Sequence, residues 1–200
     1  GRPARRVAPL GGAGNYWNDA AMLEPHFRYA TAEDVPKVTS LIERAYRGPE
    51  AAEGWASEAH LLTGPRTTEG EIGALITDSE SRFVLAELPD ILRGDLLVGC
   101  ALIQKDGEGS YFGMFAIEPA QQIAGLGKAL LAKCERAARD LWAAKSMSMV
   151  VINVREELIA WYERRGYART GHREPFPFGP ATGELHRDFD LIELKKSFEK

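Results

Sequence analysis

The stretch from Tyr111 to Trp142 constrains the fold of this chain more than any other. Its aromatic and β-branched beginning, Tyr111 to Ile117, predicts a strand. A polar loop opens at Glu118-Pro119 and closes on Gly125-Leu-Gly127, where an amphipathic helix begins at once. The unpaired N–H groups and the dipole at such a helix start favour an anion. We therefore expect a phosphate-bearing ligand at this loop.

Two common phosphate-binding loops are excluded by residue spacing. A Walker loop needs a glycine where this chain has Gln122, and a serine or threonine where it has Ala129. A dinucleotide-binding fingerprint needs a glycine where the chain has Leu130. Neither class fits the loop.

The composition is that of one globular domain with a buried core, since 44% of the 200 residues are hydrophobic and 27% are charged. We expect residues 26–200 to form this single domain. Residues 1–25 are rich in Gly, Pro, Ala and Arg. Their prolines and glycines interrupt any amphipathic helix, which favours a flexible extension over an organelle-targeting segment.

Charge and cysteine usage narrow the class of protein further. The formal net charge of −4 argues against nucleic acid as a partner, because phosphate backbones are bound by clustered Lys and Arg. No apolar run approaches the roughly 20 residues that a membrane-spanning helix needs. Cys100 and Cys134 lack the spacing of zinc ligands, so we expect buried free thiols, no metal site and a cytoplasmic protein.

Hydrophobic periodicity predicts the elements before the loop. A strand at His26 to Ala30 leads into a helix that Thr31 or Asp34 caps and that ends near Gly48-Pro49. A short helix follows around Ile72 to Ile76. Three antiparallel strands come next, with a hairpin turn at Asp106-Gly107: Phe83 to Leu88, Leu96 to Gln104 and Tyr111 to Ile117.

The elements after the loop include a helix crossover. The helix from Gly125 to about Ala143 has one apolar face that should pack on the sheet, made of Leu126, Leu130, Cys134, Ala137 and Leu141. Because a strand at Ser146 to Val154 follows this helix, it should lie parallel to Tyr111 to Ile117. The rest is predicted as a helix at Arg155 to Arg165 ended by Gly166, a strand at Tyr167 to His172, a loop at Arg173 to Gly183 and a strand at Arg187 to Leu194.

Two motifs resemble the signatures of the GNAT superfamily of N-acetyltransferases. Gln122-Ile-Ala-Gly125-Leu-Gly127 resembles the acetyl-CoA loop, whose pattern is Q/R-x-x-G-x-G/A, and Leu158-Ile-Ala-Trp161-Tyr162-Glu-Arg-Arg-Gly166-Tyr167 resembles the second signature. Both occur in the family's order with a strand between them. The resemblance covers roughly residues 26–195. It implies an α+β fold with a mixed, mostly antiparallel sheet of about six or seven strands, helices on both faces and a splayed parallel strand pair at the acetyl-CoA site.

The resemblance also implies how acetyl-CoA is held as co-substrate. Backbone N–H groups of Phe115, Ala116 and Ile117 would bind the acetyl carbonyl and the pantetheine arm. The pyrophosphate would lie on the loop and helix start, with Lys128 as a charge contact or a solvated lysine: Gln122, Ile123, Ala124, Gly125, Leu126, Gly127, Lys128 and Ala129. Many relatives carry an asparagine at the position of Arg155, and Asn153 could compensate for it.

For catalysis, the resemblance implies that Tyr162 is the general acid that protonates the leaving thiolate; the alternative is a core tyrosine. The general base stays open, because Tyr111 occupies the position where many relatives have a glutamate, and a water relay or a deprotonated substrate could replace it. Candidate acceptor-site residues are Trp55, Glu58, Tyr111 and His172, of which Trp55 could equally cap the core.

The resulting hypothesis is an N-acetyltransferase that moves an acetyl group from acetyl-CoA to a primary amine of a small molecule, by direct attack in a ternary complex. One alternative is a CoA-binding module that is non-catalytic or uses a longer acyl group, motivated by the missing base. Another is an acetyltransferase of protein N-termini or lysines, which needs an open groove that the proline-rich loop at 173–183 disfavours. Monomer and homodimer remain undecided.

Overall fold

The fold is given by a computed structural model that describes residues 24–48, 58, 60–90, 92, 94–119, 125–178, 183 and 188–199. The N-terminal extension predicted for residues 1–25 therefore lies almost wholly outside the described residues. Among the described helices, none combines the length and the hydrophobicity that crossing a membrane requires.

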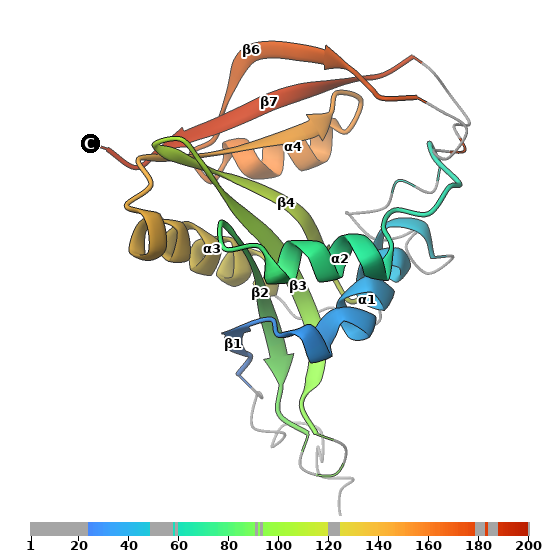
Figure 1. The fold of residues 1–200 in the computed structure, drawn as a ribbon. Helices are drawn as coiled ribbons and strands as arrows, with labels where there is room; N and C mark the ends of the chain where they lie inside the picture. The colour runs from blue at the N-terminus through green and yellow to red at the C-terminus, as the bar shows by residue number, and fades with distance from the viewer. Residues whose placement is uncertain are drawn as a thin grey trace, which may run out of the picture.

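A seven-stranded sheet in the order β1-β2-β3-β4-β5-β7-β6 forms the centre of the fold (Figure 1). All neighbouring strands are antiparallel except β4 and β5, which are parallel because α3 crosses over between them. The strands are β1 (His26–Tyr29), β2 (Ser81–Leu88), β3 (Leu96–Asp106), β4 (Gly109–Ile117), β5 (Ser146–Ile152), β6 (Ala168–Pro175) and β7 (Asp190–Ser197). This arrangement confirms the predicted α+β class.

Helices cover both faces of the sheet, as predicted (Figure 1). They are α1 (Val35–Arg47), which a 3-10 turn at Ala32–Asp34 precedes, α2 (Glu69–Thr77), α3 (Leu126–Trp142) and α4 (Glu156–Glu163). The alternation of side chains along β2 separates the two cores. Phe83 and Leu85 pack in the cluster of α1 and α2, whereas Val84 packs in the cluster of α3 and α4.

Two details of the predicted elements are wrong. Leu141 is 40% exposed, although Leu126, Leu130 and Cys134 of the same face of α3 are buried. It lies in the last turn, where the apolar periodicity outlasts the packed length of the helix. The loop predicted from Arg173 begins later, because β6 continues to Pro175. Since β6 is an edge strand, the missing N–H of a proline at its end costs no essential ladder bond.

The two cysteines are buried free thiols, as predicted. Burial raises the pKa of Cys100 to about 12, and it raises the pKa of Cys134 well above its ordinary value. Because the thiolate is the reactive form, neither side chain is poised for nucleophilic chemistry.

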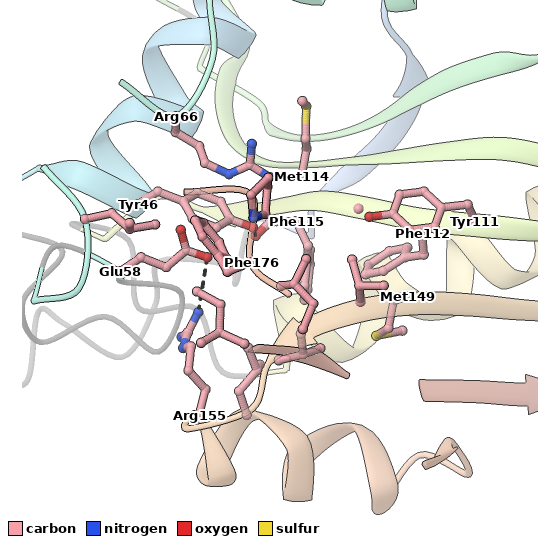
Figure 2. Close-up of a pocket in the computed structure, with 18 of the residues that line it drawn as sticks. Tyr46, Glu58, Arg66, Tyr111, Phe112, Met114, Phe115, Met149, Arg155 and Phe176 are labelled. Atoms are coloured by element: carbon pink, nitrogen blue, oxygen red, sulfur yellow. Dashed lines mark hydrogen bonds and ion pairs between the residues drawn. The ribbon is translucent and has the colours of Figure 1, made fainter. Parts of the chain in front are cut away.

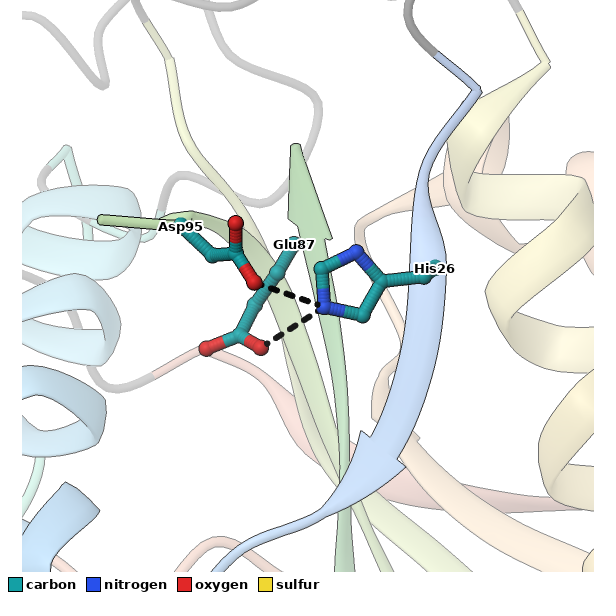
Figure 3. Close-up of side chains that lie close together, drawn as sticks. All are labelled: His26, Glu87 and Asp95. Atoms are coloured by element: carbon teal, nitrogen blue, oxygen red, sulfur yellow. Dashed lines mark ion pairs between the residues drawn. The ribbon is translucent and has the colours of Figure 1, made fainter. Parts of the chain in front are cut away.

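A cluster of charged and polar side chains attaches the short edge strand β1 to its neighbours. We call it the β1 ion cluster, and it contains His26, Arg28, Asp34, Glu87 and Asp95. Arg28 donates from Nε and Nη2 to Glu87 at 2.7 and 2.6 Å, and from Nη1 and Nη2 to Asp34 at 2.7 Å each. The hydrogen bonds from Arg28 hold the pKa of the Asp34 carboxyl at about 2. His26 Nε2 lies 3.2 Å from both Glu87 Oε2 and Asp95 Oδ2 (Figure 3).

Candidate active site

Strands β4 and β5 separate soon after they meet, and a cavity of about 340 Å³ lies at the separation. Their ladder contains only the pairs Ser110↔Met147 and Tyr111↔Ser148, which confirms the predicted splayed pair. The end of α1, the segment around Pro65, the start of α4 and the turn at Phe176 complete the walls (Figure 2).

A bulge in β4 shapes one wall of this cavity. Met114 has a φ of 44°, and the β3–β4 register shifts opposite it, between Cys100 and Leu102. A left-handed residue other than glycine costs about 1–3 kcal/mol, so the surroundings must hold it. The Tyr46 hydroxyl of α1 donates to the Phe115 carbonyl at 3.0 Å and so fixes the strand at the bulge.

Tyr46 was not among the predicted site residues, although it continues the buried face of α1 that Val38, Ile42 and Ala45 form. The hydrophobic periodicity of α1 was therefore the sequence signal that could have placed Tyr46 in the interior. Burial raises the pKa of Tyr46 to about 12, so its hydroxyl stays a neutral donor.

Tyr162 of α4 is part of the aromatic core and also borders the cavity. The residue is 4% exposed, and its ring makes edge contacts with Phe112, Trp161 and Tyr167 at centroid distances of 6.4, 5.0 and 5.8 Å. No described residue forms a hydrogen bond with its hydroxyl. Burial raises the pKa of Tyr162 well above its ordinary value, so the phenol keeps its proton at neutral pH.

Charged side chains gather at one side of the cavity; we call them the cavity ion cluster, and it contains Arg47, Glu58, Arg66 and Arg155. Arg47 Nη1 lies 2.9 Å from Glu58 Oε2, and Arg155 Nη1 lies 4.0 Å from Glu58 Oε1. Figure 2 shows Glu58 between Arg155, to which a dashed line joins it, and Arg66. Glu58 supplies the one carboxylate among the described lining residues.

Tyr111, a predicted acceptor-site residue, also lines the cavity. Its ring lies over Gly113, where a Cβ would come within 2.8 Å of Tyr111 Cε1. A side chain at position 113 would therefore displace the ring. Burial raises the pKa of Tyr111 above its ordinary value.

The predicted phosphate site lies at the start of α3. Gly125 precedes the helix with a φ of 84°, and a Cβ there would meet nothing within 4 Å. Lys128 is exposed, Leu126 is buried, and Gly127 and Ala129 are half-buried in the first turn. Gln122, Ile123 and Ala124 lie outside the described residues, as does Trp55.

Of the remaining predicted site residues, some line the cavity and others do not. Phe115 lines it, and Ala116 and Ile117 follow on β4. The Asn153 side chain accepts a hydrogen bond from the Asp190 N–H at 2.9 Å and so ties the end of β5 to β7. His172 is exposed on β6 and is absent from the described lining.

The carboxylate of Glu118, at the start of the predicted loop, is paired with an arginine and is not simply exposed to solvent. Arg44 Nη2 donates to Glu118 Oε2 at 2.6 Å, and the Glu118 side chain is only 13% exposed. This pair joins α1 to the end of β4, and it keeps Glu118 in a structural contact rather than in the cavity lining.

Comparisons with known proteins identify the family and the fold. A family model described as the acetyltransferase (GNAT) family matches residues 38–167. Three solved structures share the fold at low identity. The ribosomal-protein-S18-alanine N-acetyltransferase of Escherichia coli has a TM-score of 0.63 and 14% identity, covering 88% of this chain and 95% of its own. The chimera of Vibrio cholerae and hSSAT spermidine N-acetyltransferases has a TM-score of 0.61, 15% identity and coverages of 87% and 95%.

The third structure is the IAA acetyltransferase of Bacillus cereus, with a TM-score of 0.60, 15% identity and coverages of 87% and 99%. A comparison with curated protein sequences finds no match. At these identities the solved structures establish the shared fold, and the family model establishes the kind of domain.

Proposed function

The chain belongs to the acetyltransferase (GNAT) family, and on this premise we propose that it moves an acetyl group from acetyl-CoA to the primary amine of a small molecule. The observation that carries the proposal is the cavity of about 340 Å³ at the splayed β4–β5 pair, with Tyr162 in its wall. We take residues 26–200 as a single acetyltransferase domain.

Members of this family use acetyl-CoA, and the described residues fit such a ligand. The start of α3 has no side-chain cap and no acidic residue in its first turn, so its N–H groups can meet a pyrophosphate. The open space at Gly125 favours close approach of the ligand to the backbone. We propose that Gly125 to Ala129 hold the pyrophosphate, and that backbone N–H groups of Phe115 to Ile117 hold the acetyl and pantetheine groups.

Acetyl-CoA, when bound, supplies a thioester carbonyl carbon that the neutral amine attacks, so that a C–N bond forms and the C–S bond breaks. We propose that the Tyr162 hydroxyl donates a hydrogen bond to the departing sulfur. Burial supports this role, because the raised pKa keeps the phenol protonated while the thiolate develops its charge.

The amine acceptor must be held in the cavity and must lose a proton before it attacks. No carboxylate lies on β4, so we propose that the acceptor's ammonium is held near Glu58 and loses its proton through water. Contacts with Arg47 and Arg155 hold the Glu58 carboxylate at the cavity wall, where its oxygens can accept hydrogen bonds from the ammonium.

Thiol release from acetyl-CoA, measured with a library of small amines and of peptides, tests the proposal alongside calorimetric CoA binding. We expect micromolar to millimolar CoA affinity and turnover with small amines. CoA binding without turnover of any amine, or turnover only with a longer acyl-CoA, would favour the alternative module. Faster turnover of peptide N-termini or lysines than of small amines would favour a protein acetyltransferase.

A further inference from the structure

The charges that line the cavity are unbalanced. Its described lining contains the three guanidinium groups of Arg47, Arg66 and Arg155 against the single carboxylate of Glu58. The Arg47 and Arg155 side chains are each 11% exposed and Glu58 is 13% exposed, so these charges are largely removed from water. A surplus of buried cations is costly unless an anion meets them.

Arg66 carries the surplus charge. Arg47 donates to the Glu58 carboxylate at 2.9 Å and to the Gly64 carbonyl at 2.8 Å, and Arg155 faces Glu58 and has other interactions besides. The Arg66 guanidinium, in contrast, forms no hydrogen bond or ion pair with a described residue. Its contact is the Tyr46 ring, whose centroid lies 5.1 Å from Cζ.

The position of Arg66 is well supported. The Glu43 carboxylate of α1 accepts hydrogen bonds from the backbone N–H groups of Arg66 and Thr67 at 2.6 and 2.7 Å. Glu43 therefore holds the backbone, the Tyr46 ring supports the half-buried side chain, and the guanidinium is left to face the cavity (Figure 2). An arginine that is held in this way presents a planar set of donors that matches a carboxylate.

We propose that the acetyl acceptor carries a carboxylate, that Arg66 binds this carboxylate, and that the acceptor is a small amino acid-like amine. This inference rests on the proposed function and names its substrate class. Glu58 and Arg66 line the same cavity, so one molecule can place its ammonium toward the carboxylate and its carboxylate toward the guanidinium.

Size and charge set this class apart from other amines. Ligand cavities commonly measure about 300–1,000 Å³, and this one, at about 340 Å³, lies at the small end. A polyamine would bring several ammonium groups to a wall with three guanidiniums, which is repulsive. An amine whose carboxylate is converted to an amide keeps its shape but loses the partner for Arg66.

Matched pairs of substrates test the proposal directly. Amino acids and their primary amides are assayed for thiol release from acetyl-CoA with the full chain. We expect kcat/KM to be about 100-fold higher for the acid than for its amide, because the amide leaves the guanidinium unpaired. Equal use of acid and amide, or preference for a polyamine, would overturn the inference while leaving acetyl transfer intact.

The variant Arg66→Gln locates the effect. It should lower kcat/KM about 100-fold for the acid and less than about threefold for the amide, with the KM for acetyl-CoA unchanged. Arg136→Gln, at a 74% exposed site on α3, is the matched control. It should leave kcat/KM unchanged for both the acid and the amide. An equal loss for acid and amide in Arg66→Gln would contradict carboxylate binding, and thermal unfolding checks that each variant is folded.

If the proposed acetyl transfer is wrong, the carboxylate site can still be tested by binding. If no amine is acetylated, calorimetric titration of the same acids and amides into the chain in the presence of CoA still measures recognition. Tighter binding of the acids, lost in Arg66→Gln, would support the carboxylate site without catalysis. No difference between acid and amide would refute it.

Discussion

The β1 ion cluster and the cavity ion cluster use the same types of side chain in opposite proportions. In the first, one guanidinium, that of Arg28, donates four hydrogen bonds to the two buried carboxylates of Asp34 and Glu87. In the second, the guanidiniums of Arg47 and Arg155 share the carboxylate of Glu58, and Arg66 lines the same cavity without pairing to it. The first cluster is complete within the described chain, whereas the second leaves Arg66 for a ligand.

This difference separates stability from function. Buried carboxylates that depend on one arginine lose their compensation when it is removed, so such a residue should matter for folding. An arginine that contacts no carboxylate contributes little to folding but much to recognition of an anion. Substitutions in the two clusters should therefore change different measured quantities.

Removal of Arg28 should have the largest effect on stability. Arg28→Met leaves Asp34 and Glu87, whose side chains are 7% and 4% exposed, without their guanidinium. We expect the free energy of unfolding, measured by denaturant titration, to fall by about 3–5 kcal/mol. Arg136→Met, in an exposed pair with Asp140, should cost less than about 1 kcal/mol. A loss for Arg28→Met as small as that of this control would mean that the β1 ion cluster is not a folding element.

The next effect concerns two tyrosines that share one aromatic cluster. The Tyr167 hydroxyl donates to Glu135 Oε1 at 3.1 Å, whereas the Tyr162 hydroxyl meets no described partner and its side chain lines the cavity. Tyr162→Phe should lower kcat about 100-fold with unchanged CoA affinity. The matched control Tyr167→Phe should leave kcat unchanged and lower stability by about 1 kcal/mol. Full turnover of Tyr162→Phe at every pH would exclude the proposed hydrogen bond from Tyr162 to the departing sulfur.

Acid titration tests the β1 ion cluster more finely. The pKa of Asp34 is lowered to about 2 in the folded chain, from its ordinary value of 3.8. The unfolded state therefore binds the proton more readily, so the stabilisation is present above pH 3.8 and is lost as the pH falls through 2. The shift corresponds to about 2 kcal/mol. Unfolding curves between pH 5 and pH 2 should show this loss in the parent chain and a smaller one in Asp34→Asn. If the free energy of unfolding falls equally with pH in the parent chain and in Asp34→Asn, then Asp34 does not contribute to the acid sensitivity.

The sequence predicted the parts of the fold that local patterns encode. The strand, glycine loop and helix at 111–142 and the motif at Trp161-Tyr162 led to a mixed sheet with a splayed parallel pair, and the structure has both. Glu58 and Tyr111, named as acceptor-site candidates, line the cavity. Periodicity and turn chemistry act over a few residues, so they carry this information.

Contacts between distant segments could not be predicted in the same way. The partners Arg28 and Glu87 are separated by 59 residues, and Tyr46 and Phe115 by 69. The left-handed residue of the bulge is Met114 and not the neighbouring Gly113, so the residue type at position 114 did not indicate its backbone conformation. Arg66 acquires its role only because its segment packs over α1, and that packing is a tertiary outcome with no signature in the sequence.

The smallest expected effect concerns the outer part of the β1 ion cluster. His26, Glu87 and Asp95 offer ligand atoms within 4.8 Å of one another, which would suit a metal ion (Figure 3). However, Arg28 already donates to both Glu87 oxygens, and a cation at this position would compete with the guanidinium. His26 and Asp95 are 44% and 47% exposed, so Asp95→Asn should cost less than about 1 kcal/mol.

Metal titration tests whether His26, Glu87 and Asp95 bind a metal ion. Excess Zn²⁺ or a chelator should leave the thermal midpoint of the parent chain and of Asp95→Asn equally unchanged. A rise in the midpoint with Zn²⁺ that Asp95→Asn abolishes would show that the cluster binds a metal. The β1 ion cluster would then be open to a ligand as the cavity ion cluster is, and the two would differ only in the sign of the charge that each accepts.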